Sequence, residues 1–122
     1  AYSMAGITNP RKEVDYFSPH DCLIARQFVQ SEAAGFFDEG EAWRYIMEGR
    51  TAYDGDRPFH PTGGRSSMGH AWSASAGAEV AEAVAQMRGE CGERQTKVPV
   101  RTAVIMNEGA GPNANCTVLK KL

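Results

Sequence analysis

The pattern of hydrophobic and polar positions in the first half of the chain predicts three helices and one short strand. Residues 1–6 have the character of a small helix that a glycine closes, and a polar turn is expected at residues 9–12. Apolar side chains at 14–17 indicate a strand that the next proline ends. Over 22–34 and over 40–48, apolar residues recur at three- and four-residue steps and a glycine follows, which predicts two amphipathic helices.

The second half of the chain predicts one long helix between extended segments. Residues 59–64 form an extended approach to a double-glycine turn. Residues 70–88 are helical, and their first half is so rich in Ala, Gly and Ser that we expect it to be buried under a sheet. Two apolar, β-branched runs at 101–106 and 116–119 predict strands joined by the glycine loop 107–115. The order helix, strand, helix, helix, strand, helix, strand, strand favours an α/β layered fold.

Composition narrows the classes of function. The 122 residues carry 13 Lys and Arg against 15 Asp and Glu, a formal charge of −2, and 42% of positions are hydrophobic, enough for the core of one domain. Basic residues adjoin only in pairs, such as Lys120-Lys121, and the absence of a larger cluster argues against nucleic acid or an anionic membrane surface as a partner. No apolar run approaches the roughly 20 residues that span a bilayer, so we expect a soluble protein without a membrane partner.

The cysteines and the start of the chain suggest a compartment. Cys22, Cys91 and Cys116 are an odd number at wide spacing, which fits neither a disulfide framework nor a zinc ribbon, so we expect a reducing, cytoplasmic location. The chain opens without Met and without a charged segment leading into an apolar one. We therefore expect no signal peptide and an interior start.

Three loops concentrate the side chains that could carry chemistry, and each lies where a strand meets a helix or another strand. The first loop is His20-Asp21-Cys22. Asp21 is a residue type that caps helices, and free N–H groups at a helix start would activate the thiol of Cys22, with His20 close enough to exchange protons with it. Cysteine is also a common small core residue, so this alternative stays open on spacing alone.

The second loop runs from Gly63-Gly64 to Gly69-His70, and the third is Asn107-Glu108-Gly109-Ala110-Gly111. A neutral His70 near a helix start can accept a proton from a nucleophile or donate to a developing oxyanion, although a histidine at a helix cap is often structural. Backbone N–H groups in the third loop can point at a carbonyl oxygen, although hairpin loops are rich in glycine for conformational reasons alone. We interpret four further residues as structural: His60, Glu79, Cys91 and Cys116.

Taken together and in this order, the three loops resemble the C-terminal half of the thiolase superfamily. The run from Gly6 to Asp15 ahead of the first loop and Pro61-Thr62 ahead of the second belong to the resemblance, which spans essentially the whole chain. The branch that it is most similar to contains the thiolases related to sterol-carrier and nonspecific lipid-transfer proteins. The resemblance implies a thiolase-like layered fold with a mixed sheet and helices on its faces. Residues 1–122 would be its C-terminal part, with the N-terminal, nucleophile-bearing half absent.

In that family two similar α/β halves pair around an active site for acyl-CoA thioesters. The resemblance implies that His70 activates the missing nucleophile and helps to hold the thioester oxygen, and that His20 lines the same oxyanion site. It implies that Cys22 is the acid/base that moves the proton at the α-carbon of the second substrate. The backbone of a second oxyanion hole is implied at Asn107, Gly109 and Gly111.

The implied reaction is Claisen condensation or its reverse, the thiolytic cleavage of a 3-oxoacyl-CoA. A coenzyme A thioester is the substrate, no cofactor is permanently bound, and no metal is needed because hydrogen bonds polarise the carbonyl group. The implied partner is the N-terminal thiolase half or a companion subunit, in a homo- or hetero-oligomer.

The chain departs from the family pattern on the loops that face the substrate. Leu23 replaces the Phe that usually follows His-Asp-Cys, and Met106 stands where this branch usually carries His. Ala71 and Trp72 replace the Pro and the small residue expected after Gly69-His70. We expect Leu23, Trp72 and Met106 to contribute to the substrate pocket, and the large indole of Trp72 to reshape the part that takes the acyl chain.

Two alternatives to acyl transfer remain open at this stage. One is a retro-aldolase that acts on a branched CoA thioester together with an OB-fold partner. A nucleophilic cysteine upstream would favour acyl transfer, its absence would favour aldol chemistry, and the retention of Cys22 and His70 favours the thiolase side. The other is a non-catalytic subunit that completes a complex with a thiolase or lipid-binding partner.

Overall fold

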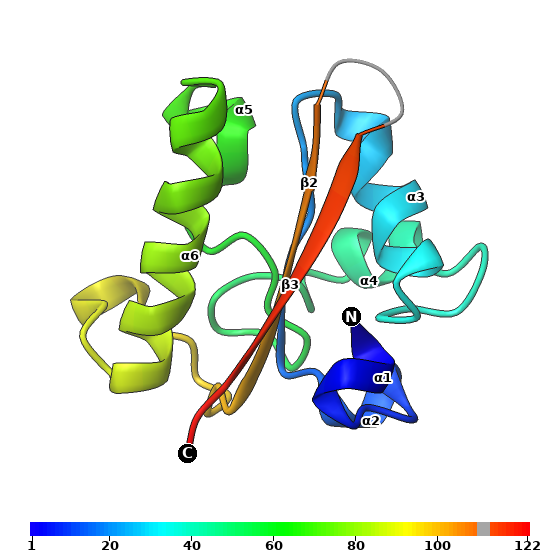
Figure 1. Ribbon diagram of the computed structural model, residues 1–122, viewed down its shortest axis with the longest axis vertical. Helices are drawn as coiled ribbons and strands as arrows, with labels where there is room; N and C mark the ends of the chain where they lie inside the picture. Colours follow the sequence, from blue (N-terminus) through cyan, green and yellow to red (C-terminus); the bar gives the residue numbers. More distant parts are fainter. Residues whose placement is uncertain (110–112) are drawn as a thin grey trace.

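A three-stranded mixed sheet lies at the centre of the computed structural model, which describes residues 1–109 and 113–122 (Figure 1). The strands are β1 (Tyr16–Ser18), β2 (Thr102–Glu108) and β3 (Ala114–Lys120). Their order is β1-β2-β3, with β1 parallel and β3 antiparallel to the central β2. The predicted α/β fold with a mixed sheet is confirmed.

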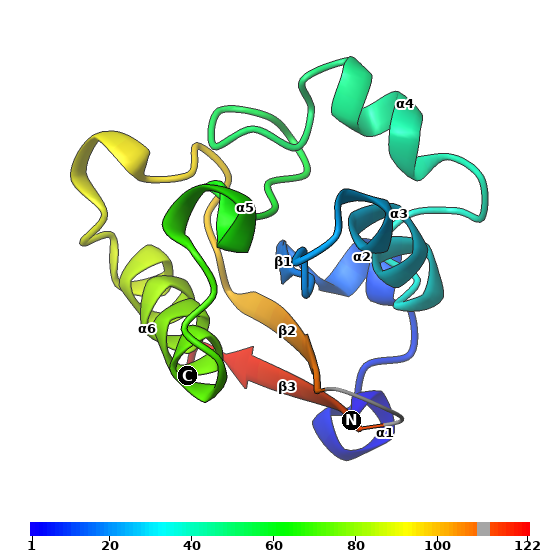
Figure 2. The same cartoon turned by 90° about the horizontal axis from the view of Figure 1, so that it is seen from above.

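Helices cover both faces of this sheet. They are α1 (Tyr2–Ala5), α2 (Pro10–Glu13), α3 (Ile24–Ala33), α4 (Ala42–Met47), α5 (Gly64–Met68) and α6 (Ser73–Arg88), and a 3₁₀ turn lies at Gly92–Arg94. Figures 1 and 2 show α6 on one side of the sheet and α3 and α4 on the other. Among the described residues, no helix combines the length and apolar character that crossing a bilayer requires.

Each face of the sheet has its own core because side chains alternate along a strand. Val104 of β2 packs on one face in a cluster with Phe17 and Phe36, all without exposed surface. Its neighbour Ile105 packs on the other face with Tyr16 and with Ala83 of α6. Burying a large apolar side chain contributes about 1.5–3 kcal/mol, so the central strand stabilises both layers at once.

The topology brings the three predicted loops to one end of the molecule. The parallel strands β1 and β2 finish at the same edge of the sheet, so the segment after Ser18 lies beside the end of β2. The first turn of α6 lies at this same end (Figure 1). His20, His70 and Asn107 are thereby brought together although they are far apart in the chain.

Several local predictions are wrong because short elements depend on contacts that periodicity does not report. Residues 10–12 of the expected turn belong to helix α2, where the carboxylate of Glu13 accepts the N–H of Asn9 at 2.6 Å. Residues 59–64 form no strand; Phe59 makes one isolated bridge to Phe17. The five-residue helix α5 follows where only a turn was expected.

The two longer helices also differ from expectation at their starts. Helix α3 begins at Ile24 and not at residue 22, and no side chain caps it, so Asp21 has another role. Helix α6 begins at Ser73, and most of its small-residue first half, including Ala74 and Gly77, is exposed instead of buried under the sheet. The buried stripe of this helix includes Ser75, Glu79 and Gln86, which are polar.

We predict that replacing Gly64 by Ala destabilises the fold. Gly64 has φ +62°, a left-handed conformation, and a Cβ there would collide with the carboxylate of Asp21. The Gly64→Ala variant is expected to lower the free energy of unfolding by about 2–4 kcal/mol, since it adds backbone strain and disturbs buried hydrogen bonds. Urea denaturation measures the change.

The matched control is Gly77→Ala, in the exposed interior of α6, where an added Cβ meets nothing within 4 Å. It should raise the unfolding free energy by roughly 0.5–1 kcal/mol, because alanine is the better helix former. Equal stability of the Gly64→Ala variant and the native chain would contradict the close contact between the Asp21 carboxylate and Gly64.

Candidate functional site

A cleft of about 720 Å³ opens at the end of the molecule where the three loops meet. His20 and Cys22 line it from the first loop, His70 and Trp72 from the second, and Asn107 from the third. Arg65 of α5 also lines it, together with Arg26 of α3, Glu108 and several small residues. The structure therefore joins the three sequence-predicted loops in one cavity.

A closed ring of hydrogen bonds holds His20. Its backbone N–H donates to Oε1 of Gln30 at 2.6 Å, and Nε2 of Gln30 donates to Oε1 of Glu108 at 2.7 Å. The backbone N–H of Glu108 completes the ring by donating to Nδ1 of His20 at 3.3 Å. Burial, reinforced by the positive charge of Arg65, lowers the pKa of His20. With Nδ1 accepting, the neutral ring carries its hydrogen on Nε2.

His70 has a similar backbone restraint. The N–H of Trp72 donates to its Nδ1 at 3.1 Å, and the hydroxyl of Ser75 lies 3.4 Å from the same atom. The ring packs edge-on against His20, with 5.2 Å between ring centroids. Trp72 itself adopts φ 49°, an uncommon conformation for a bulky residue, and its indole is 83% exposed at the cleft. The strained backbone of Trp72 thus directs its N–H at His70 and exposes its indole to solvent.

Cys22 is exposed beside the two histidines. Its Sγ and one ring nitrogen of His20 and His70 all lie within 4.8 Å of one another, a set of residue types that can hold a metal ion. Both Nδ1 atoms already accept an N–H, which leaves both Nε2 atoms bearing hydrogen and no free lone pair for a metal. The donor set therefore suits a hydrogen-bonded anionic oxygen better than a cation.

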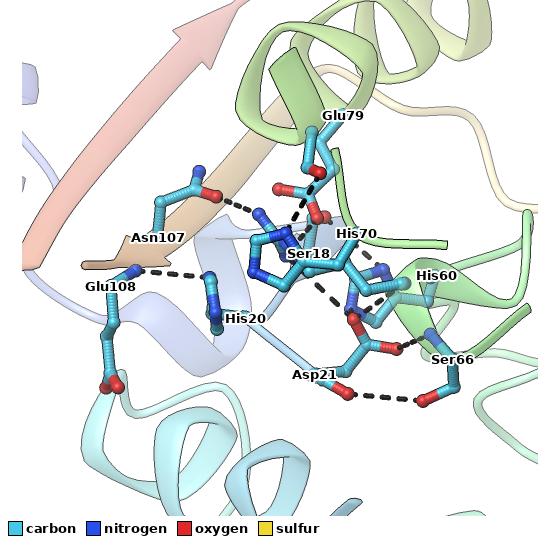
Figure 3. A network of polar contacts seen from close by, with 12 residues as sticks. Ser18, His20, Asp21, His60, Ser66, His70, Glu79, Asn107 and Glu108 are labelled. Carbon is cyan, nitrogen blue, oxygen red and sulfur yellow. Dashed lines mark hydrogen bonds and ion pairs between the residues drawn. The ribbon is translucent and has the colours of Figure 1, made fainter. Parts of the chain in front are cut away.

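Beneath the cleft, the carboxylate of Asp21 anchors helix α5. Its Oδ1 accepts the backbone N–H of Arg65 at 2.8 Å, and its Oδ2 accepts that of Ser66 at 3.3 Å (Figure 3). The hydroxyl of Ser66 donates to the carbonyl oxygen of Asp21 at 3.1 Å. Asp21 is fully buried, so these bonds are shielded from water. Asp21 caps α5, a helix 44 positions further along, and not α3.

The guanidinium of Arg65 continues this network. It donates to Oε1 of Glu79 on α6 and to Oδ1 of Asn107 at the end of β2. All three side chains are at least nine-tenths buried. Burial raises the pKa of Glu79 to about 7, against the opposing effect of the Arg65 charge. Glu79, interpreted from the sequence as structural, does not line the cleft itself but pairs with Arg65, which does.

His60 lies on the far side of Asp21. Its Nε2 is 3.6 Å from Oδ1 of Asp21 and its Nδ1 is 3.4 Å from the hydroxyl of Ser18. Burial lowers the pKa of His60 to about 4, although the Asp21 charge opposes the shift. The ring is therefore neutral at pH 7 and adds no charge to the network.

The other sequence-predicted residues lie in different surroundings. The N–H of Gly109 donates to the carbonyl oxygen of Asn113 at 2.8 Å and so closes the hairpin. Gly111 lies outside the described residues. Leu23 is 61% exposed and Met106 packs against the core on the α3 side, and neither lines the cleft. Of the three residues expected in the substrate pocket, Trp72 is the one that the cleft contains.

Sequence reasoning missed Arg65, and one signal was available. Arginine is rarely buried without a partner, and this one directly follows the double glycine of the expected turn. Glu79 lies on the same helical stripe as Ser75 and Ala83, which the apolar spacing places inside. Two opposite charges at buried positions indicate an ion pair, even though 14 residues separate them.

Comparison with known proteins agrees with this geometry. The family described as "Thiolase C-terminal domain-like" matches residues 1–121. Acetyl-CoA acetyltransferase of Methanothermobacter thermautotrophicus is 38% identical over 97 residues, 80% of this chain and 25% of that protein. Human sterol carrier protein 2 is 33% identical over 120 residues, 98% of this chain and 21% of that protein. Benzoylsuccinyl-CoA thiolase subunit BbsB of Thauera aromatica is 29% identical over 106 residues, 87% of this chain and 28% of that protein.

The match over almost the whole chain, together with the mixed sheet and the helices on its faces, defines an α/β domain of the thiolase C-terminal type. The chain belongs to the thiolase family, as a C-terminal domain of that family. The resemblance identified from the three loops, including its likeness to sterol-carrier-type thiolases, is confirmed. The chain spans about a quarter of the length of the relatives that it matches.

We predict that His60 reduces stability in acid. Its pKa in the folded protein is about 4, below the ordinary 6.5, so the unfolded chain binds the proton more tightly between these values. The buried neutral ring therefore costs no stability above about pH 6.5. As the pH falls toward 4, the free energy of unfolding decreases by up to about 3 kcal/mol.

The variant His60→Asn should lose less stability across this pH window, because asparagine tolerates the positive φ of 51° and does not titrate. Urea denaturation at several pH values measures both proteins, so that the carboxylates common to both cancel in the difference. Parallel stability curves for the two proteins would contradict the prediction.

Proposed function

We propose that this domain supplies the oxyanion-binding and acid–base part of a thiolase-type acyltransferase that acts on acyl-CoA thioesters. The N-terminal thiolase half, or a companion chain, supplies the nucleophilic cysteine and completes the site. The reaction is Claisen condensation or the thiolytic cleavage of a 3-oxoacyl-CoA. The observation that carries the proposal is the pair His20 and His70, whose Nδ1 atoms each accept a backbone N–H at the head of the cleft.

The two histidines serve as hydrogen-bond donors. When a thiolate or carbanion attacks a thioester, negative charge develops on the carbonyl oxygen, and N–H groups fixed beforehand stabilise it without reorganisation. Two Nε2–H groups on rings 5.2 Å apart are suited to converge on one oxygen atom. Removing one such donor typically costs about 100- to 1000-fold in rate. The bond from Trp72 favours donation by His70 over base catalysis in the resting state.

Cys22 is the proposed acid/base of the second step. Its thiol lies within 4.8 Å of both imidazoles and is open to the cleft, where a substrate α-carbon would approach. A thiolate can remove a proton from the α-carbon, and the thiol can return it in the reverse direction. The carbanion formed would be stabilised as an enolate by N–H groups of the protein that donate to the carbonyl oxygen of the same thioester.

The need for a second half is supported by the surface of α6. Ser73, Ala74, Gly77 and Ala81 are exposed on this helix. Small side chains permit the close approach of another backbone, as at helix contacts between tightly packed layers. The names of the acetyl-CoA acetyltransferase and of the benzoylsuccinyl-CoA thiolase subunit support CoA thioester chemistry and, for the latter, a multi-subunit assembly.

We predict that the donor pair is needed for turnover. In the full-length protein, assayed by the consumption of free coenzyme A as acetoacetyl-CoA is cleaved to two acetyl-CoA, His70→Ala and His20→Ala should each lower kcat by about 100- to 1000-fold. KM should change little, because the lost hydrogen bonds strengthen only in the transition state. The control is Met47→Ala, an exposed residue of α4 outside the cleft. Full turnover by the His70→Ala variant would refute the proposal.

We also predict that Trp72 shapes the acyl site. Trp72→Gly relieves the positive φ and removes the indole from the cleft wall. The ratio of kcat/KM between long and short 3-oxoacyl-CoA substrates should shift by about tenfold toward the longer chain. Trp43→Ala, which removes an exposed indole from α4 outside the cleft, is the matched control. An unchanged ratio in the Trp72→Gly variant would show that the indole has no part in selecting the acyl chain.

A further inference from the structure

An ion pair spans the turn that carries His70. Arg65 is the second residue of α5 and Glu79 lies in the second turn of α6, with His70 between the two helices. Nη1 of Arg65 donates to Oε1 of Glu79, and the two residues are 6% and 9% exposed. Because the turn from 69 to 72 joins the paired helices, its path is restrained from both sides.

The same arginine contacts the other two loops. Its backbone N–H is held by Asp21, the residue between His20 and Cys22. Its Nη2 donates to the carboxamide of Asn107, where β2 ends and the third loop begins. Among the described residues of the second loop, Arg65 is therefore the one that bonds to both the first and the third loop.

Arginine suits this role for physical reasons. Its planar guanidinium presents donors in a fixed fork, so two acceptors on different elements are held at a defined angle. The guanidinium stays charged, and a buried charge that loses one partner costs several kcal/mol. The arrangement therefore has one favoured geometry instead of a range of them.

We propose that Arg65 and Glu79 are positioning residues that set the separation between His70 and His20. The ion pair fixes the angle between α5 and α6, and Asp21 fixes α5 against the loop of His20. This inference rests on the proposed function only for its catalytic consequence. We call the Arg65–Glu79 ion pair, together with the bond from Arg65 to Asp21, the brace. The brace itself is a property of the folded chain.

The brace should respond to pH. The charged and titratable groups that face Glu79 are Arg65 from α5, Asp21 from the loop after β1 and Tyr16 from β1, with the neutral Asn107 from β2 beside them. The pKa of Glu79 is about 7, so acid converts the ion pair into a weaker neutral bond. Arg65 then keeps Asp21, 3.9 Å away, as its anionic neighbour.

The test measures the separation between the imidazole rings of His20 and His70 directly, in the full-length protein. With isotope-labelled histidine, a nuclear Overhauser contact between the ring protons of His20 and His70 reports their separation. In the native protein it should be strong at about pH 8 and weaken as the pH falls through about 7. In Glu79→Gln and Arg65→Lys it should be several-fold weaker at both pH values. Glu82→Gln, which removes a carboxylate of α6 that pairs with Arg94, should behave as the native protein.

A second variant distinguishes loss of the brace from loss of the folded state. The double substitution Arg65→Met and Glu79→Leu replaces the pair by apolar residues of similar volume, a change that buried ion pairs often tolerate. If this variant and Glu79→Gln retain native circular dichroism and the full ring contact, the brace is overturned. Loss of the contact in folded variants supports it.

Turnover separates this inference from the proposed function. With acetoacetyl-CoA as the probe, Glu79→Gln should lower kcat by about 10- to 100-fold with KM changed less than about threefold, since a misplacement near 1 Å is costly to rate. We expect the kcat of the native protein to fall below about pH 7, where Glu79 becomes protonated, and Glu79→Gln should lack this fall. If the native protein does not turn over acyl-CoA, the proposed function fails, and the ring contact still decides the brace.

Discussion

The buried carboxylate of Asp21 is the interaction on which the cleft depends. It accepts two backbone N–H groups at the start of α5, a helix of only five residues. So short a helix is unstable alone, and its first N–H groups need acceptors. Asp21 supplies them from a segment more than 40 residues earlier, which ties the loop of His20 and Cys22 to the approach to His70. Gly64 makes the contact possible because it has no side chain to displace the carboxylate.

The surrounding charges follow from this buried anion. Two carboxylates, Asp21 and Glu79, share the single guanidinium of Arg65, and His60 beside them is held neutral by burial. Burial of charge is costly unless partners are well placed, which makes alternative arrangements of these side chains unfavourable. The cluster contributes less to net stability than to the choice of one geometry for the cleft floor.

Backbone groups, more than side chains, determine what the two histidines can do. The N–H of Glu108 and the N–H of Trp72 each occupy an Nδ1 atom. Both rings therefore present Nε2–H to the cleft, and the pair is suited to an oxygen that becomes negative. The uncommon conformation of Trp72 is part of this arrangement, since its backbone N–H donates to His70 while φ is 49°.

Much of the fold was predictable from the amino-acid sequence by itself. Periodicity located β1, the hairpin of β2 and β3, and helices α3, α4 and α6 to within a few residues. It did not report which side chains are buried, since the buried positions of α3 and α6 include polar residues such as Gln30 and Glu79. The order of the three loops also identified the thiolase family and its candidate residues His20, Cys22 and His70. Sequence reasoning failed at α2 and α5, whose stability comes from single carboxylates of Glu13 and Asp21 and not from a repeating pattern.

Only the tertiary structure decided how these residues are connected. The pairing of Arg65 with Glu79 and Asn107 joins positions 14 and 42 residues apart, and no local spacing reports such a contact. The same holds for the placement of Met106 in the core instead of the cleft, which depends on the face of β2 that meets α3. Local sequence determines which side chains are available and which elements they favour. Long-range packing and the cost of burying charge determine which of them meet and which proton each one carries.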